Sequence, residues 1–183
     1  MNFLDEFGLL TASVTPGQSA IVVVFSGEKN SSQAAKGTAY LFSSDQTSSG
    51  SVDTKNSTSN VPIVSGGYDK KSGTTYSQAP DGTYINVPTV ACIDSPTAAA
   101  TLADGNHGTT YMPLGITKGA AAGDAVHQSN ATVTSDYARS QGCPVVVGNT
   151  DIDMNKTKTN YQALVNIIDG KKATVVVSST KYK

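Results

Sequence analysis

Residues that could act as nucleophiles or bases are few and widely spaced in this sequence. Cys92 and Cys143 are its two cysteines, and His107 and His127 are its two histidines. A cysteine hydrolase needs a thiolate beside a base, which a third group orients. Nothing around these four residues is typical of such a set, and no Gly-x-Ser-x-Gly motif marks a serine nucleophile. We therefore expect a protein that is not an enzyme.

The two cysteines have another use, because both adjoin apolar runs. A disulfide between Cys92 and Cys143 would contribute roughly 4 kcal/mol in the chain-entropy model. Two buried thiols are the alternative. The first ten residues carry Asp5 and Glu6 and no basic segment, so they do not resemble a secretory signal. That observation favours the reduced form, since disulfides belong to oxidising compartments.

One short segment resembles the opening of a calcium loop. Asp151, Asp153 and Asn155 place oxygen ligands at alternate positions, as in an EF-hand. Lys156 then stands where the turn glycine belongs, and Gln162 replaces the bidentate glutamate. We also expect no flanking helices. Calcium is thus the one ion considered, a plain acidic turn is the alternative, and no other cofactor is expected.

Composition sets several classes of protein aside. Charged residues are 15% of the chain, the net charge is −1, and Arg139 is the sole arginine. A nucleic-acid binder needs clustered cations, so none is expected as a partner. No apolar run approaches 18 residues, which argues against a membrane span. Without tryptophan, a sugar-stacking platform would depend on tyrosine.

Short runs rich in valine, isoleucine and tyrosine dominate the pattern. The run at 20–25 has the unbroken apolar character of a strand buried on both faces. The other runs lie at 38–42, 61–64, 83–87, 90–93, 143–147, 161–168 and 173–177, with weaker candidates at 109–114 and 124–134. Turn signals separate them, and Pro88 indicates an edge or a break. We predict an all-β fold: an antiparallel sandwich or barrel, with a jelly roll among the alternatives.

Helices should number at most one or two short ones. Residues 97–103 follow Ser95-Pro96, a typical helix start. Near the end of the sequence, Asp169-Gly170 lies between two apolar runs and favours a hairpin. The residues Tyr161, Leu164, Val165 and Ile168 also fit one helical face. We prefer the hairpin, because β-branched residues surround the turn.

Two long polar stretches and the first residues suggest contacts with other chains. Residues 43–60 contain one aliphatic side chain, Val52, and residues 65–82 are similarly polar. Such segments bury too little apolar surface to order themselves, and neighbouring subunits could supply the missing contacts. Residues 1–12 form an apolar arm or the lead-in to a first strand, and residues 13–183 form a single β domain. Apolar arm residues are candidates for subunit contacts: Phe3, Leu4, Phe7 and Leu10.

These features predict a non-enzymatic structural subunit of a large assembly. The simplest role is that of a virion protein, such as a phage capsid decoration or cement protein. Its partners would be copies of itself and other structural proteins of the same particle. One alternative is a secreted, extracellular subunit of a filament, surface layer or adhesin. Another is a carbohydrate-binding β-sandwich module.

Overall fold

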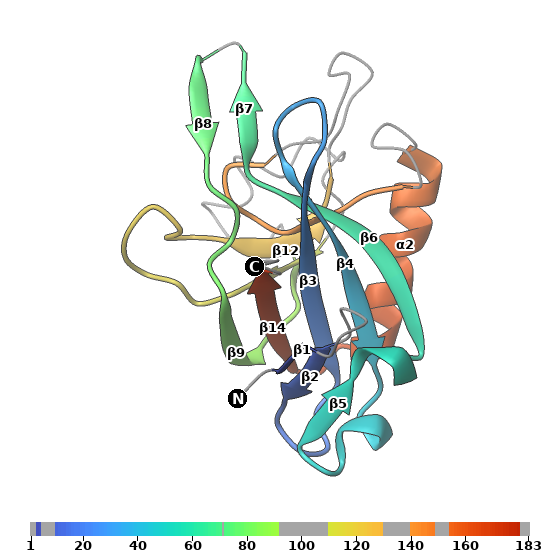
Figure 1. Ribbon diagram of the computed structural model, residues 1–183. Coiled ribbons are helices and arrows are strands. Elements are labelled where there is room, and N and C mark those ends of the chain that lie inside the picture. The colour runs from blue at the N-terminus through green and yellow to red at the C-terminus, as the bar shows by residue number, and fades with distance from the viewer. Residues whose placement is uncertain are drawn as a thin grey trace.

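The computed structural model describes residues 3–4, 10–70, 72–91, 110–129, 140–148 and 154–179. Strands dominate this part of the chain (Figure 1). In chain order the elements are β1 Phe3–Leu4, β2 Leu10–Ser13, β3 Ala20–Lys29, β4 Ala35–Phe42, η1 Asp45–Thr47, β5 Ser51–Asp53, η2 Thr54–Asn56, β6 Ser59–Ser65, β7 Gly67–Asp69, β8 Thr74–Tyr76, β9 Gly82–Val87, β10 Val90–Ala91, β11 Thr110–Pro113, β12 Ala125–Gln128, β13 Val145–Val146, α2 Met154–Ile168 and β14 Ala173–Ser179. The predicted all-β class is confirmed. The helix predicted at 97–103 lies outside the described residues.

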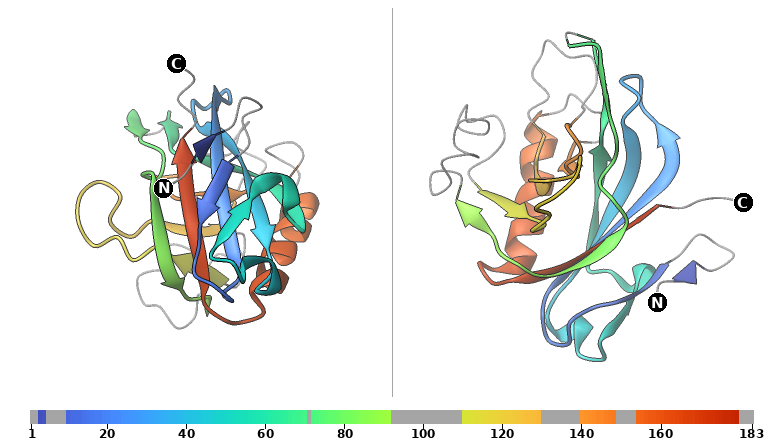
Figure 2. Two further views of the ribbon diagram at one scale, coloured as in Figure 1. Left: turned by 60° about the horizontal axis from the view of Figure 1, so that its bottom comes forward. Right: turned by 90° about the vertical axis from the view of Figure 1, so that its left-hand side faces the viewer.

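Nine strands form one large sheet in the order β10-β11-β12-β13-β6-β4-β3-β14-β9. Most neighbours are antiparallel, as predicted, whereas β14–β3 and β12–β13 are parallel pairs. The sheet curls around α2, which stands inside the curl (Figure 2). Its two end strands, β9 and β10, are consecutive in sequence and separated by Pro88 and Thr89 alone. The two edges of the sheet therefore meet at this proline, which lacks the N–H that a continuing ladder would use. The result is a barrel-like fold.

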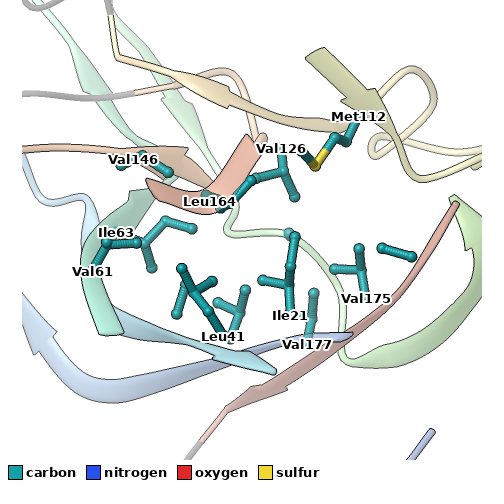
Figure 3. Packing of buried hydrophobic residues seen from close by; sticks show 14 of the residues in the cluster. Ile21, Leu41, Val61, Ile63, Met112, Val126, Val146, Leu164, Val175 and Val177 are labelled. Carbon is teal, nitrogen blue, oxygen red and sulfur yellow. The ribbon is translucent and has the colours of Figure 1, made fainter. Parts of the chain in front are cut away.

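Strand β3 shows how the sequence pattern builds two layers of core. Its run from Ala20 to Val23 is buried on both faces, as the sequence predicts. Ile21, Val23 and Phe25 face the interior that α2 occupies, whereas Ala20 and Val22 face a second, smaller cluster. Figure 3 shows the interior, where Leu164 of α2 lies among side chains from strands on different sides of the curl. A strand buried on both faces needs a layer on each side, and α2 provides the inner one.

The three-stranded sheet β1-β2-β5 provides the outer layer. Leu10, Ala12 and Val14 pack with Val52 against the outer face of β3 and β14. The polar stretch at 43–60 belongs to this layer, folding into η1, β5 and η2. Thr54 is buried and accepts a hydrogen bond from the Leu10 backbone N–H at 3.0 Å. A few buried residues thus anchor this stretch to its own chain, and the suggested contacts with neighbouring subunits stay a prediction.

Residues 161–168 form a helix, so the preferred hairpin was wrong. Tyr161, Leu164 and Ile168 are buried on one face of α2 and join the interior core. Asp169 (φ +51°) and Gly170 (φ +66°) take left-handed conformations, but they end the helix instead of turning a hairpin. The strand that follows, β14, lies between β3 and β9 and runs parallel to β3. The helical periodicity of the apolar residues outweighed the local turn signal.

Candidate functional site at the start of β12 and β13

The structure describes only one of the three proposed calcium ligands. Asp151 and Asp153 lie outside the described residues, and Asn155 is an exposed residue in the first turn of α2. The expectation that no helix flanks this segment was wrong, since α2 begins at Met154. Within the described residues, no three histidine, cysteine or acidic side chains lie close enough to share a metal ion. The calcium site stays a prediction.

The residues proposed for subunit contacts lie in different surroundings. Leu10 is 1% exposed and packs in its own chain's outer cluster, so its side chain is not free to meet a neighbour. Phe3 and Leu4 form β1, whose backbone pairs with Thr11 and Leu10. Phe7 lies outside the described residues. For Leu10, the structure therefore shows packing on its own domain.

Tyr68 and Tyr76, two of the eight tyrosines of the chain, lie on the hairpin of β7 and β8. Tyr76 is opposite Gly67, and Tyr68 is opposite Thr75. Directly opposed residues share a face, and consecutive residues of a strand alternate between faces. Tyr68 and Tyr76 therefore point to opposite faces of the hairpin. They do not form a common platform.

Cys143 precedes β13 and has no disulfide partner among the described residues. Burial is the main cause that raises its pKa to about 11 from an ordinary value of 9.0. The thiol is therefore protonated at neutral pH, where only a thiolate would be a good nucleophile. Cys92 and His107 lie outside the described residues, so their pairing or cooperation with Cys143 stays a prediction. His127 is buried in β12, with Nδ1 2.8 Å from the Gln128 carbonyl oxygen.

A short segment around β12 concentrates buried polar side chains, which the sequence analysis did not predict. Asp124, His127, Gln128 and Ser129 are each less than a tenth exposed. Between them, Val126 faces the apolar interior. Buried polar groups need partners to be tolerated, and perturbed ionisable groups concentrate at functional sites. This segment is the candidate functional site.

Asp124 is the most perturbed residue of this site. It is 4% exposed, its Oδ1 lies 3.9 Å from the Cys143 Sγ, and its Oδ2 has no hydrogen-bond partner among the described residues. Burial raises the pKa of this carboxyl group from 3.8 to about 6, and the thiol contact opposes the shift in part. The charge of Asp124 in turn helps to raise the pKa of Tyr84, for which burial is the larger cause.

The wall beside Asp124 is the turn at residues 140–143, which polar contacts fix to the end of β6. Ser140 and Gly66 exchange two hydrogen bonds, each of 3.0 Å, and the Ser140 hydroxyl also donates to the Cys143 carbonyl at 2.6 Å. Ser65 donates to the Gly142 carbonyl and accepts from the Ala79 N–H. Gly142 itself has φ +131°, and a Cβ atom there would lie 2.7 Å from Asp124 Oδ1. Only glycine allows so close an approach.

This arrangement supports one kind of chemistry. A carboxyl group with a pKa of about 6 exchanges a proton near neutral pH, as a general acid or base must. Its nearest reactive neighbour, however, is a thiol that stays protonated in that range. Asp124 and Cys143 thus do not constitute an activated nucleophile with its base. What the site can do is take up and release a proton.

Comparison with known proteins identifies no relative of this chain. No family of known proteins, no curated protein and no solved structure matches the chain. In the part of the chain that the structure describes, no helix has the length and apolar character needed to cross a membrane.

Proposed function

We propose that this chain is a non-enzymatic structural subunit of a large assembly, most simply a decoration or other structural protein of a virion. The observation that carries the proposal is the filled interior of the barrel. Small β-barrels either fill their interior with side chains or enclose a ligand there. In this chain, Tyr161, Leu164 and Ile168 of α2 belong to the same core cluster as the inward-facing strand residues. Figure 3 shows Leu164 among them. A filled barrel suits a rigid building block whose contacts lie on its outer surface.

Surface charge supports packing between copies of the chain. The sequence has 13 basic and 14 acidic residues, so copies would meet with little net repulsion. The ion pairs Lys36–Glu28 and Lys171–Asp169 are solvent-exposed and local. Ile85, on the end strand β9, is 63% exposed and is the most exposed large apolar side chain of the described residues. Uncharged edges of this kind are where protein chains add to one another.

Sedimentation velocity and electron microscopy of the purified protein test the proposal. We expect species larger than a monomer at micromolar concentration, in closed shells, rings or patches. The proposal would be contradicted if the protein stayed a monomer at every concentration. The same holds if it stayed a monomer when mixed with the other proteins of the assembly. Filaments would replace the virion role by that of a filament subunit.

Deletion of residues 2–9 then tests the N-terminal arm. Because Leu10 is part of the outer cluster, the deletion must stop before it. We expect weaker assembly with a melting temperature close to that of the full chain. Leu10→Ala is the matched control, since it should lower the melting temperature by creating a cavity. Unchanged assembly of the deletion variant would assign the contacts to other surfaces.

A further inference from the structure

The sequence contains three Asp-Gly pairs, at residues 81–82, 104–105 and 169–170. In such a pair the aspartate carboxyl group can react with the backbone nitrogen that follows it, because glycine has no side chain to shield that nitrogen. The reaction needs a carboxyl group that is free to turn, a glycine N–H without a hydrogen-bond partner, and a backbone that can rotate. Residues 104–105 lie outside the described residues, and the structure describes the other two pairs.

The carboxyl group of Asp169 is free to turn. Asp169 and Gly170 lie on the connection between α2 and β14, where residues 169–172 are all exposed. The side chain of Asp169 is 83% exposed, and its Oδ2 lies 4.0 Å from Lys171 Nζ. So exposed an ion pair restrains a carboxylate little.

The backbone around Gly170 leaves its nitrogen available. The Asp169 N–H donates to the Val165 carbonyl at 3.0 Å, and the Lys171 N–H donates to the Ile168 carbonyl at 3.0 Å. Between them, the Gly170 N–H has no hydrogen-bond partner among the described residues. A Cβ atom added to Gly170 would meet no atom within 4 Å, so open space lies beside this residue.

Asp81 and Gly82 are held in place, although Asp81 is also exposed. The Ser179 hydroxyl donates to Asp81 Oδ1 at 2.6 Å, which fixes the carboxyl group. Gly82 begins β9 and pairs with Val177 of β14 in the large sheet. A Cβ atom on Gly82 would lie 3.2 Å from the Tyr84 hydroxyl. A reaction at this pair would therefore require the end of the sheet to open.

We propose that Asp169-Gly170 is a site of spontaneous isoaspartate formation, a modification for which water is the only other reactant. The Gly170 nitrogen attacks the carboxyl carbon of Asp169 and forms a C–N bond, and the hydroxyl of the carboxyl group leaves as water with the proton of the nitrogen. A second water then opens the succinimide ring at the former backbone carbonyl. That carbonyl becomes a carboxylate, and the chain continues through the side-chain carbon of Asp169.

The product has one additional backbone carbon between α2 and β14. Because each water released is replaced by a water taken up, the overall reaction is an isomerisation and needs no oxidant or cofactor. The proposal is independent of the structural role proposed above, since it concerns a reaction within one chain.

Peptide mapping of the full chain after incubation in mild acid tests the proposal. Mild acid keeps part of the carboxyl groups protonated, as the loss of water requires. Electron-transfer fragmentation locates isoaspartate, and resistance to endoproteinase Asp-N confirms it. In the folded protein, isoaspartate should accumulate about tenfold faster at Asp169 than at Asp81, because folding protects the second pair. In urea the two rates should become similar. If Asp81 reacts as fast as Asp169 in the folded protein, or if Asp169 reacts only in urea, the proposal is wrong.

Variants of the two aspartates test the chemistry. Asp169→Glu keeps the charge, but its reaction would need a six-membered ring, which forms much more slowly. Isomerisation at this position should therefore stop. Asp81→Glu is the matched control and should leave the rate at Asp169 unchanged. Isomerisation of the same peptide in Asp169→Glu would show that another residue reacts and would overturn the proposal.

Asp169→Asn provides a second readout that does not depend on acid. Asparagine tolerates the left-handed conformation at the end of a helix, so this variant should fold. At neutral pH it should release ammonia through the same ring and give both aspartate and isoaspartate, which the change in mass reveals. If the folded variant keeps its ammonia while the urea-unfolded variant loses it, the Gly170 nitrogen is not available and the proposal fails.

Discussion

The barrel interior and the contact between Asp124 and the 140–143 turn are both buried, but burial acts differently in the two regions. In the interior, inward side chains such as Leu164 and Val126 gain stability by leaving water. At the contact, the same removal from water raises the pKa of a carboxyl group. Strand β12 belongs to both regions, since Val126 faces the interior and Asp124 directly precedes the strand. The contribution of interior packing to stability should therefore not change with pH, whereas the contribution of the Asp124 contact should.

The interior should give the largest effect. Leu164→Ala removes a fully buried side chain from the centre of the core, and we expect a loss of about 3–4 kcal/mol in the free energy of unfolding. The loss should be the same at pH 5 and pH 8. Urea unfolding followed by circular dichroism measures it. Gln162→Ala, at an exposed position of the same helix, is the control and should change stability by less than about 0.5 kcal/mol. A loss below about 1 kcal/mol for Leu164→Ala would show that α2 does not fill the barrel.

Asp124→Asn should act in the opposite direction. Because the folded-state pKa exceeds the ordinary 3.8, the contribution of Asp124 to stability is fully present below pH 4 and is lost as the pH rises through about 6. The amide keeps the shape of the carboxyl group and removes its charge. We expect the variant to be more stable by up to about 3 kcal/mol at pH 8 and little changed at pH 3.5. Thermal unfolding across this pH range measures the difference. A variant that is less stable than wild type at pH 8 would reveal a partner for the carboxylate.

Gly142→Ala should lower the free energy of unfolding by about 2–3 kcal/mol. The causes are an unfavourable φ and the close approach of the new Cβ to Asp124. Gly73→Ala is the matched control, because Gly73 also has a positive φ (+68°) but open space where a Cβ would stand. That variant should lose about 1 kcal/mol. Chemical denaturation of both proteins separates the two causes. If both variants lose the same stability, the turn at residues 140–143 can shift to accommodate the added Cβ without a further cost.

The smallest effect concerns two polar residues on the inner side of α2. Thr157 is 1% exposed and its hydroxyl has no partner among the described residues, whereas Asn160 donates to the Val147 carbonyl at 2.7 Å. Thr157→Val should therefore stabilise the protein by about 1 kcal/mol, and Asn160→Ala should destabilise it by a similar amount. Thermal unfolding of the two variants provides the test. If both variants lose stability, the Thr157 hydroxyl has a partner.

Much of the fold follows from the sequence because β-strands leave local marks. The runs at 20–25 and 38–42 and the break at Pro88 are strands or strand ends in the structure. The segment at 161–168 was mispredicted for a physical reason. Asp169-Gly170 suits a hairpin turn and a helix end equally well, and the choice depends on the space inside the curled sheet. That space exists only once distant strands have paired.

The candidate site was beyond prediction for a related reason. Asp124 is one of 12 aspartates, and its local sequence, between Gly123 and Ala125, resembles an ordinary loop end. Its burial arises from the turn at residues 140–143, which the end of β6 holds in place. The one local signal is that this aspartate leads directly into an apolar strand. Cys143, in contrast, was predicted to be a buried thiol or one half of a disulfide, and burial of its thiol raises its pKa in the structure.

The central position of β14 also has a consequence for the order of folding. This strand separates β3 from β9, and Thr174 at its start accepts a hydrogen bond from Thr15, 159 positions away in sequence. Contacts between such distant segments incur the entropy of closing a long loop before they contribute any stability. Until β14 inserts, β3 and β9 each present an unpaired edge rich in apolar residues. Folding should be slow, on the order of milliseconds to seconds, and intermediates lacking β14 should be the species most prone to aggregate.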